Sequence, residues 1–207
     1  MNKTLNTLFG AILLAGSASA FAASSVDLTV TGLITPSACT PTLANGGVVD
    51  YGKISAKDLN ADKTTPLGEK GVELYVTCDA ATLVALEPKD NREGSSSVDG
   101  KQNFGLGLIN GTEKLGRMAL YLDATIADGV SVRRIRSEDG GLTWSANARL
   151  SNGDLTSVAD TNILAPLPFQ TLTGRLTAAA VIAPTKDLTL TNEVSIDGSV
   201  TLTVRYL

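Results

Sequence analysis

The sequence predicts an all-β fold, a sandwich or a barrel, from its turn dipeptides, its alternating runs and its composition. Asn-Gly and Asp-Gly pairs recur along the chain, and such pairs adopt the positive φ angles that tight hairpins need. Short runs of alternating apolar and polar residues lie between them, as in half-buried strands. With 43% hydrophobic, 4% aromatic and 18% charged residues, the chain favours strands over helices and an aliphatic core.

Seven alternating runs are expected to form strands. In the run "GVELYVTC", Val72, Leu74 and Val76 share one face, whereas Tyr75 and Thr77 share the other. The complete set of runs is 25–34, 71–78, 118–126, 130–137, 174–183, 187–191 and 199–207. Many short strands separated by turn signals are typical of a sandwich or barrel.

The first residues have the pattern of a secretory signal. Lys3 supplies the positive charge, an apolar stretch follows it, and Ala20 to Ala22 form a small-x-small cleavage site. Residues 1–22 are therefore expected to be removed, so that the mature chain begins at Ala23. Cleavage that leaves Phe21 first, or a retained anchor, are the alternatives.

Two cysteines, Cys39 and Cys78, lie beyond this signal. In an exported protein, two cysteines most simply form one disulfide. The bond would close a loop of about 40 residues, which the chain-entropy model values at about 4 kcal/mol.

Composition argues against several classes of function. The chain has no histidine, so it lacks the commonest general base and metal ligand. Its net charge of −4 argues against a nucleic-acid partner. We therefore expect no enzyme activity, no catalytic, cofactor-binding or metal-binding residues, and no cofactor.

Both ends of the chain carry an ordered set of motifs. Gly32 precedes Cys39 by seven residues, "VVDYGKIS" occupies 48–55, and an alternating strand leads into Cys78. The last nine residues alternate and have the aromatic Tyr206 in the penultimate position. In these features the chain resembles fimbrial subunits of the bacterial chaperone–usher pathway, the type 1 pilins. It resembles in particular a poorly characterised group of fimbria-like exported proteins, through "TGLITPSACTPTLANGGVVDYG" and "VSIDGSVTLTVRYL".

The resemblance implies an immunoglobulin-like sandwich over residues 35–207 that lacks its last strand. Residues 23–34 would be an N-terminal extension that acts as a donor strand for a neighbouring subunit. The partner of the terminal strand would then come from another chain. The donor residues implied are Val26, Leu28, Val30 and Gly32, and the edge that a chaperone would bind first comprises Val200, Leu202, Val204, Tyr206 and Leu207.

The function implied is that of a structural subunit polymerised by donor-strand exchange, which supports cell adhesion. Its partners would be a periplasmic chaperone, an outer-membrane usher and neighbouring subunits, and its location the bacterial cell surface, reached through the periplasm. The alternative is a minor or tip adhesin that binds a host glycan or surface receptor.

Two internal motifs lie between residues 132 and 144. "SEDGGLTW", from Ser137 to Trp144, matches the Asp-box pattern of bacterial sialidases and predicts a hairpin in which Asp139 accepts hydrogen bonds from turn amides. A surface contact patch and an enzyme signature are the alternatives for this motif. "VRRIR" concentrates Arg133, Arg134 and Arg136. These arginines are expected on solvated strand faces near Glu138 and Asp139, and binding of an anionic glycan is the alternative.

Overall fold

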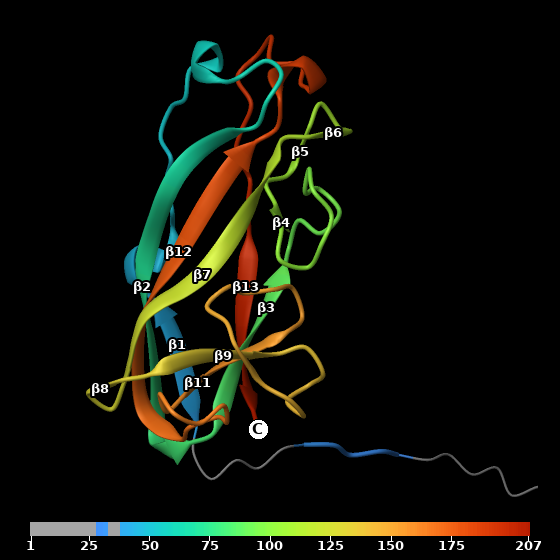
Figure 1. Ribbon diagram of the computed structural model, residues 1–207. Helices are drawn as coiled ribbons and strands as arrows, with labels where there is room; N and C mark the ends of the chain where they lie inside the picture. Colours follow the sequence, from blue (N-terminus) through green and yellow to red (C-terminus); the bar gives the residue numbers. More distant parts are fainter. Residues whose placement is uncertain (1–27, 33–37) are drawn as a thin grey trace, which may run out of the picture. The chain divides into compact units, whose positions relative to one another are not determined.

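The computed structural model of the protein describes residues 28–32 and 38–207. Residues 38–207 form a sandwich of two open β-sheets, with no α-helix among the described residues (Figure 1). The predicted all-β class is thus confirmed, as a sandwich and not a barrel.

The two sheets have five-strand paths in which neighbours are hydrogen-bonded, and most neighbours are distant in sequence. The first sheet has the order β1 (Cys39–Leu43), β2 (Thr65–Thr82), β12 (Phe169–Ile182), β7 (Gly116–Ala127) and β4 (Phe104–Gly105), with β8 (Val130–Ser131) paired to β7. The second has the order β10 (Ser145–Ala146), β9 (Arg133–Ser137), β11 (Leu155–Ala159), β3 (Val84–Asp90) and β13 (Val200–Tyr206). The remaining elements are the hairpin β5 (Leu108–Ile109) and β6 (Glu113–Lys114) and the 3-10 turns η1 (Ala44–Gly47), η2 (Ala56–Asp58) and η3 (Thr185–Asp187).

At two hairpins, the turn dipeptides form the tight turns that their chemistry predicts. Asp128 and Gly129 connect β7 to β8 with φ values of 47° and 82°. Asn110 and Gly111 connect β5 to β6 with φ values of 51° and 83°. Positive φ at both central residues gives the twist that matches two flanking strands.

The main core lies between the sheets and is largely aliphatic. Leu74, Leu122 and Val158 are almost completely buried, and Phe104 and Phe169 are the two aromatic residues of this cluster. A second cluster, around Leu106 and Ile182, fills the other end of the sandwich. The predicted aliphatic core is therefore what the chain builds.

The predicted disulfide between Cys39 and Cys78 is present. The two residues are direct partners in the antiparallel pairing of β1 with β2. The bond therefore fixes β1, which is an edge strand of the first sheet, to its only strand neighbour within the described residues.

Sequence-based expectations need correction at the last two of the seven runs. The run 187–191 was expected to be a strand, but its first residue, Asp187, ends the turn η3 and no strand follows, because Leu188 and Leu190 pack against the second core cluster from an irregular segment. The terminal strand was expected to find its partner in another chain, but β13 pairs along one side with β3, from Val200 opposite Asp90 to Tyr206 opposite Val84. Only its other side lacks a strand neighbour among the described residues.

Candidate functional site

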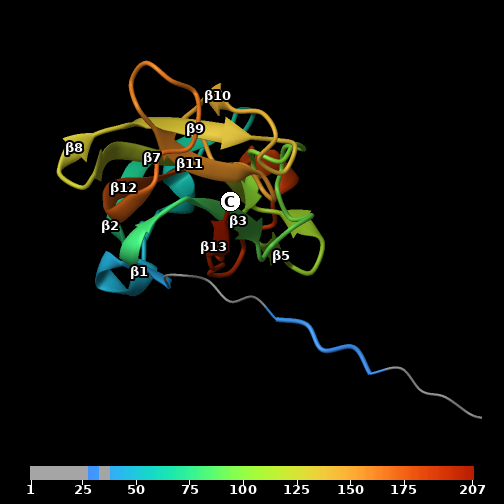
Figure 2. The same cartoon turned by 90° about the horizontal axis from the view of Figure 1, so that it is seen from below.

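The edge strands β1 and β13 belong to different sheets but lie on the same side of the sandwich (Figure 2). The Cys39 N–H donates a hydrogen bond of 2.9 Å to Tyr206 Oη, which joins the first residue of β1 to the last of β13. Beyond this bond no ladder connects the two strands in the described part of the chain. This side of the sandwich is therefore open between its two sheets.

The register of β13 determines which backbone groups face the opening. The Asn91 N–H donates to the Ser199 carbonyl at 3.0 Å, and the Leu207 N–H donates to the Leu83 carbonyl at 3.1 Å. In an antiparallel pair, hydrogen-bonded positions alternate with positions whose N–H and C=O point away from the partner. The N–H and C=O groups that point away from β3 are therefore those of Val200, Leu202, Val204 and Tyr206.

The same residues bring apolar side chains to the open edge. Val200, Leu202 and Val204 pack against the main core cluster but remain only partly buried, in contrast to the paired strand β3, most of whose residues are buried. A hydrophobic side chain that lacks one neighbouring strand retains contact with water. The open edge of β13 thus combines unpaired backbone groups with incompletely covered aliphatic side chains.

A cavity of about 550 Å³ lies beside the residues that precede β13. Residues 49–54 form one wall and residues 192–196 form the opposite wall, with Val49 and Val194 half-buried in them. We call this cavity together with the open edge of β13 the edge site. Its apolar lining includes Val49, Tyr51, Leu190, Val194 and Ile196 from the cavity and Val200, Leu202 and Val204 from β13.

Tyr51 fixes the first wall of the cavity. Its hydroxyl donates to the Ala178 carbonyl at 2.8 Å and accepts from the Ala180 N–H at 3.3 Å, so residues 49–54 are held against β12. Partial burial is the main reason that the pKa of Tyr51 is raised. The sequence signal for this wall was the short motif "VVDYG", although its spacing alone did not show that Tyr51 anchors a cavity.

Two carboxylates fix the second wall. Glu113 accepts a hydrogen bond of 2.6 Å from the Thr189 N–H, and this bond lowers the pKa of the glutamate. Asp197 accepts two bonds of 2.8 Å from Arg92, which lower the pKa of the aspartate. The segment before β13 is therefore held in place although it has no strand ladder of its own.

The predicted donor residues are described only in part. Val26 lies outside the described residues. Residues 28–32 are in no strand, and the side chains of Leu28 and Val30 are 89% and 86% exposed. Gly32 is likewise among the described residues and lies in no strand. The donor role stays a prediction.

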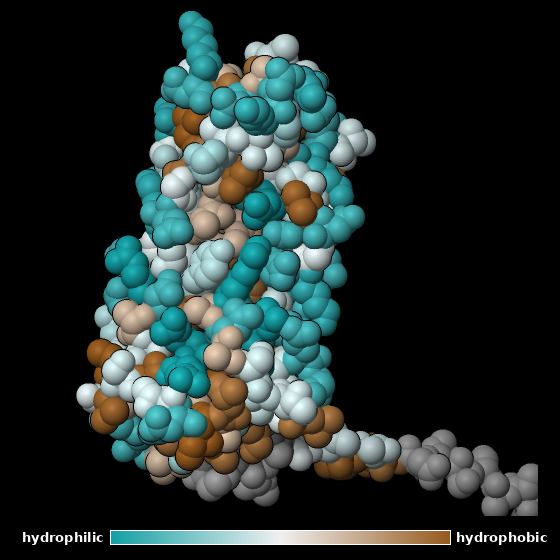
Figure 3. All heavy atoms as spheres, viewed as in Figure 1, coloured by the Kyte–Doolittle hydropathy of each residue, from teal (hydrophilic) through white to brown (hydrophobic). Residues whose placement is uncertain are grey.

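Exposed apolar side chains gather at one end of the sandwich (Figure 3). Leu83 connects β2 to β3, and its carbonyl accepts the hydrogen bond from Leu207, whose side chain is 46% exposed. The β11–β12 connection adds Ile163 and Leu164, which are also exposed. The predicted edge residue Leu207 therefore lies beside an exposed apolar residue where β13 ends.

The predicted Asp-box hairpin is confirmed, with β9 and β10 paired on either side of its loop. Asp139 Oδ1 accepts hydrogen bonds from Ser137 Oγ (2.7 Å) and the Thr143 N–H (2.9 Å), and Oδ2 accepts from Thr143 Oγ1 (2.6 Å). Trp144 Nε1 closes the loop by donating to the Gly141 carbonyl at 3.0 Å. These bonds, led by that from the Thr143 side chain, lower the pKa of Asp139 to about 2.

Replacement Asp139→Asn is expected to reduce the stability of the chain at neutral pH, with a difference that disappears in acid. The pKa of Asp139 is about 2 in the folded chain and about 3.9 in an unfolded one. Its contribution is therefore complete above about pH 4 and is lost as the pH falls through about 2. Urea unfolding of both chains across this pH range measures it, and a difference that persists unchanged in acid would refute the assignment.

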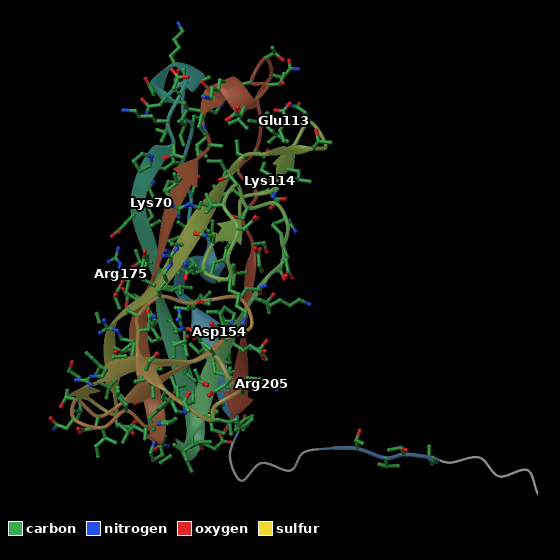
Figure 4. The ribbon with its side chains drawn as sticks, turned by 45° about the vertical axis from the view of Figure 1, so that its right-hand side comes forward. Lys70, Glu113, Lys114, Asp154, Arg175 and Arg205 are labelled. Atoms are coloured by element: carbon green, nitrogen blue, oxygen red, sulfur yellow. A yellow bond between two sulfur atoms is a disulfide. The ribbon has the colours of Figure 1, made fainter. Side chains whose placement is uncertain are left out.

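The three clustered arginines have different surroundings. Arg136 pairs with Glu138, as expected, and its Nε also lies 3.8 Å from the buried Asp154, which is labelled in Figure 4. Arg133 and Arg134, however, form no ion pair with any described residue, so the expected acidic neighbours serve only one of the three. Sequence adjacency could not reveal this difference.

Two other kinds of feature, a metal-ligand cluster and a membrane-spanning helix, are absent from the described residues. Among them, no group of three or more His, Cys, Asp or Glu side chains could hold a metal ion. No helix in the described ranges is both long and apolar enough to cross a membrane.

The fold and the edge site define a class of protein: an all-β sandwich that has one disulfide and an open strand edge. Sequence comparison places it more closely, and the chain belongs to the DUF1120 family, described as "Protein of unknown function", whose model matches residues 28–116. It is 32% identical to Protein GltF of Escherichia coli (strain K12) over 252 aligned positions, which cover 99% of this chain and 98% of that protein. It is 30% identical to Uncharacterized protein YhcF of the same strain over 145 positions, 60% of each chain. Neither name refers to a fimbria.

Proposed function

We propose that the chain is a structural subunit of a bacterial fimbria, joined to its neighbours by donor-strand exchange. The observation that carries the proposal is the open edge of β13, where four residues turn their backbone groups away from β3 and three of them, Val200, Leu202 and Val204, have incompletely covered aliphatic side chains. Residues 25–34, with their apolar alternation, have the pattern of a strand that would fill it.

The energetics favour an added strand at this position. An exposed sheet edge with apolar side chains is prone to aggregation unless it is covered. A donor strand would supply ladder hydrogen bonds and would bury Val26, Leu28 and Val30, at about 1.5–3 kcal/mol for each side chain. Because donor and acceptor surfaces differ, each added chain would present a new acceptor, and such head-to-tail contacts propagate into a fibre.

The proposed assembly route follows from the same exposed edge. A periplasmic chaperone would cover β13 until an outer-membrane usher passes the subunit to its neighbour, and the fibre would stand on the bacterial cell surface. In this route the signal at residues 1–22 directs export, and the extension 23–34 becomes free to donate.

Two variants, one unable to donate a strand and one unable to accept a strand, test this function. A chain with Leu28→Asp and Val30→Asp should accept a donor but not give one, and a chain with Val204→Asp should give but not accept. Each alone should stay monomeric, and their mixture should stop at dimers, as measured by light scattering after gel filtration. Thr203→Asp, on the outward face of β13, is the matched control and should polymerise normally. Polymers formed by the double donor variant alone would contradict the proposal.

A further inference from the structure

Large apolar side chains are exposed at the end of the sandwich where β13 finishes (Figure 3). They come from the β2–β3 connection, the β7–β8 hairpin, the β11–β12 connection and the last residue of the chain. We call them the end patch. Each is between 39% and 66% exposed, and together they are Leu83, Ile126, Val130, Ile163, Leu164 and Leu207. Exposed apolar patches are uncommon on isolated domains and mark interaction surfaces.

Backbone contacts hold these segments at the same end of the sandwich. The Leu83 carbonyl accepts a hydrogen bond of 3.1 Å from the Leu207 N–H. Strand β2, which ends next to Leu83, is paired there with the start of β12, and the β11–β12 connection leads directly into that start. The β7–β8 turn also meets it, because Asp128 accepts a hydrogen bond of 2.7 Å from the Thr171 N–H.

The end patch lies where the N-terminal extension joins the sandwich. Ala38 is the first described residue of the sandwich, and the Cys39 N–H beside it donates to Tyr206 Oη. Four chain steps separate Ala38 from Ile34, the last residue of the predicted donor strand. These steps span at most about 14 Å, because an extended chain covers no more than about 3.6 Å per residue. A neighbour that holds the donor strand in its edge site therefore lies against the end patch.

An antiparallel donor strand would place the cavity of the neighbour at the end patch. Residues 192–196 line the cavity and precede Val200, so the cavity lies beyond the first residue of β13. A donor that runs antiparallel to β13 has its last residue, Ile34, at the cavity. Val48 and Ile196 beside that cavity are 65% and 37% exposed, and they offer apolar side chains to the end patch.

We propose that the end patch is a second contact between subunits, which packs on the neighbouring copy of this chain that receives the donor strand. This inference rests on the proposed function, because strand exchange is what brings the two copies together. It adds an apolar contact that restricts the angle between the two subunits, which the short connection alone would leave variable.

The dimer formed by the two defective chains described above tests the proposal. In it, the chain with Val204→Asp gives its donor strand, and the chain with Leu28→Asp and Val30→Asp accepts it. Val130→Asp with Ile163→Asp in the giving chain should weaken the dimer at least about tenfold, measured as Kd by sedimentation equilibrium. Folding should be unaffected, since these two side chains are 66% and 62% exposed.

The same two replacements in the accepting chain are the matched control, because the end patch of that chain faces away from the contact. They should leave Kd unchanged, and the accepting chain should still bind a synthetic 24–34 peptide. An unchanged Kd with the replacements in the giving chain would overturn the end-patch contact and leave strand exchange intact. Equal weakening from either chain would also overturn it. If neither the giving chain nor the peptide binds at all, the proposed function fails, and the end-patch contact fails with it.

Discussion

A chain that carries a second copy of residues 24–34 after Leu207, on a short Gly/Ser linker, is expected to melt about 10 °C higher than the unmodified chain. The linker lets the added segment return beside β13 as an antiparallel strand and fill the edge site. Burial of three aliphatic side chains and new ladder hydrogen bonds should exceed the cost of ordering the segment by about 3–5 kcal/mol. For a domain of this size, 1 kcal/mol shifts Tm by about 2–4 °C.

The matched control is a fusion of equal length in which the added copies of Val26, Leu28 and Val30 are serine. It retains the backbone donors and acceptors but buries little apolar surface, so it should melt close to the unmodified chain. Differential scanning calorimetry of the three chains measures the effect. Equal melting temperatures for the two fusions would mean that the edge site does not select apolar residues.

Removal of the disulfide should have an effect of similar size and opposite sign. The double replacement Cys39→Ser with Cys78→Ser opens a covalent loop that spans 39 positions. The expected loss is about 4 kcal/mol, or roughly 8–16 °C in Tm. Thr40→Ser, an exposed replacement on the same edge strand, is the control and should change little. Unfolding of the double variant at the same urea midpoint as the parent chain would contradict this assignment.

The disulfide and the edge site should also be coupled. Cys39 joins β1 to β2 through sulfur and reaches Tyr206 of β13 through its N–H, so it lies where the two open edges meet. Without the disulfide, β1 should be held less rigidly beside the edge site. The increase in Tm that the fused donor strand gives should therefore be smaller. A double-mutant cycle between the disulfide and the fusion measures this coupling.

Local sequence chemistry predicted the local structure well. The Asp128–Gly129 hairpin followed from turn chemistry alone, and the Asp-box loop followed from Asp139. Alternation failed at 187–191, since Leu188 and Leu190 pack against the second core from a segment that Glu113 holds without a ladder. Period-two alternation shows which side chains point together but not whether a neighbouring strand is present.

At the candidate sites, prediction from the sequence was limited because the pairing of strands that are distant in the chain decides which groups are satisfied. The alternation of residues 199–207 predicted a strand, but only the pairing of β13 with β3, more than a hundred positions earlier, shows that one side is satisfied and the other open. Likewise, the sequence placed Arg134 beside Arg136, yet which of them meets Asp154 depends on how β9 and β11 pack. Such features depend on contacts that no local pattern contains.

Amide hydrogen exchange of β13, followed residue by residue by NMR, tests the central claim most directly. In the free chain, the N–H groups of Val200, Leu202, Val204 and Tyr206 point to the open edge and should exchange quickly, whereas those of Thr201 and Thr203 are bonded to β3 and should exchange slowly. Addition of a synthetic 24–34 peptide should slow exchange at the four open positions. If those four amides exchange at the same rate with and without saturating peptide, the edge site does not accept this strand.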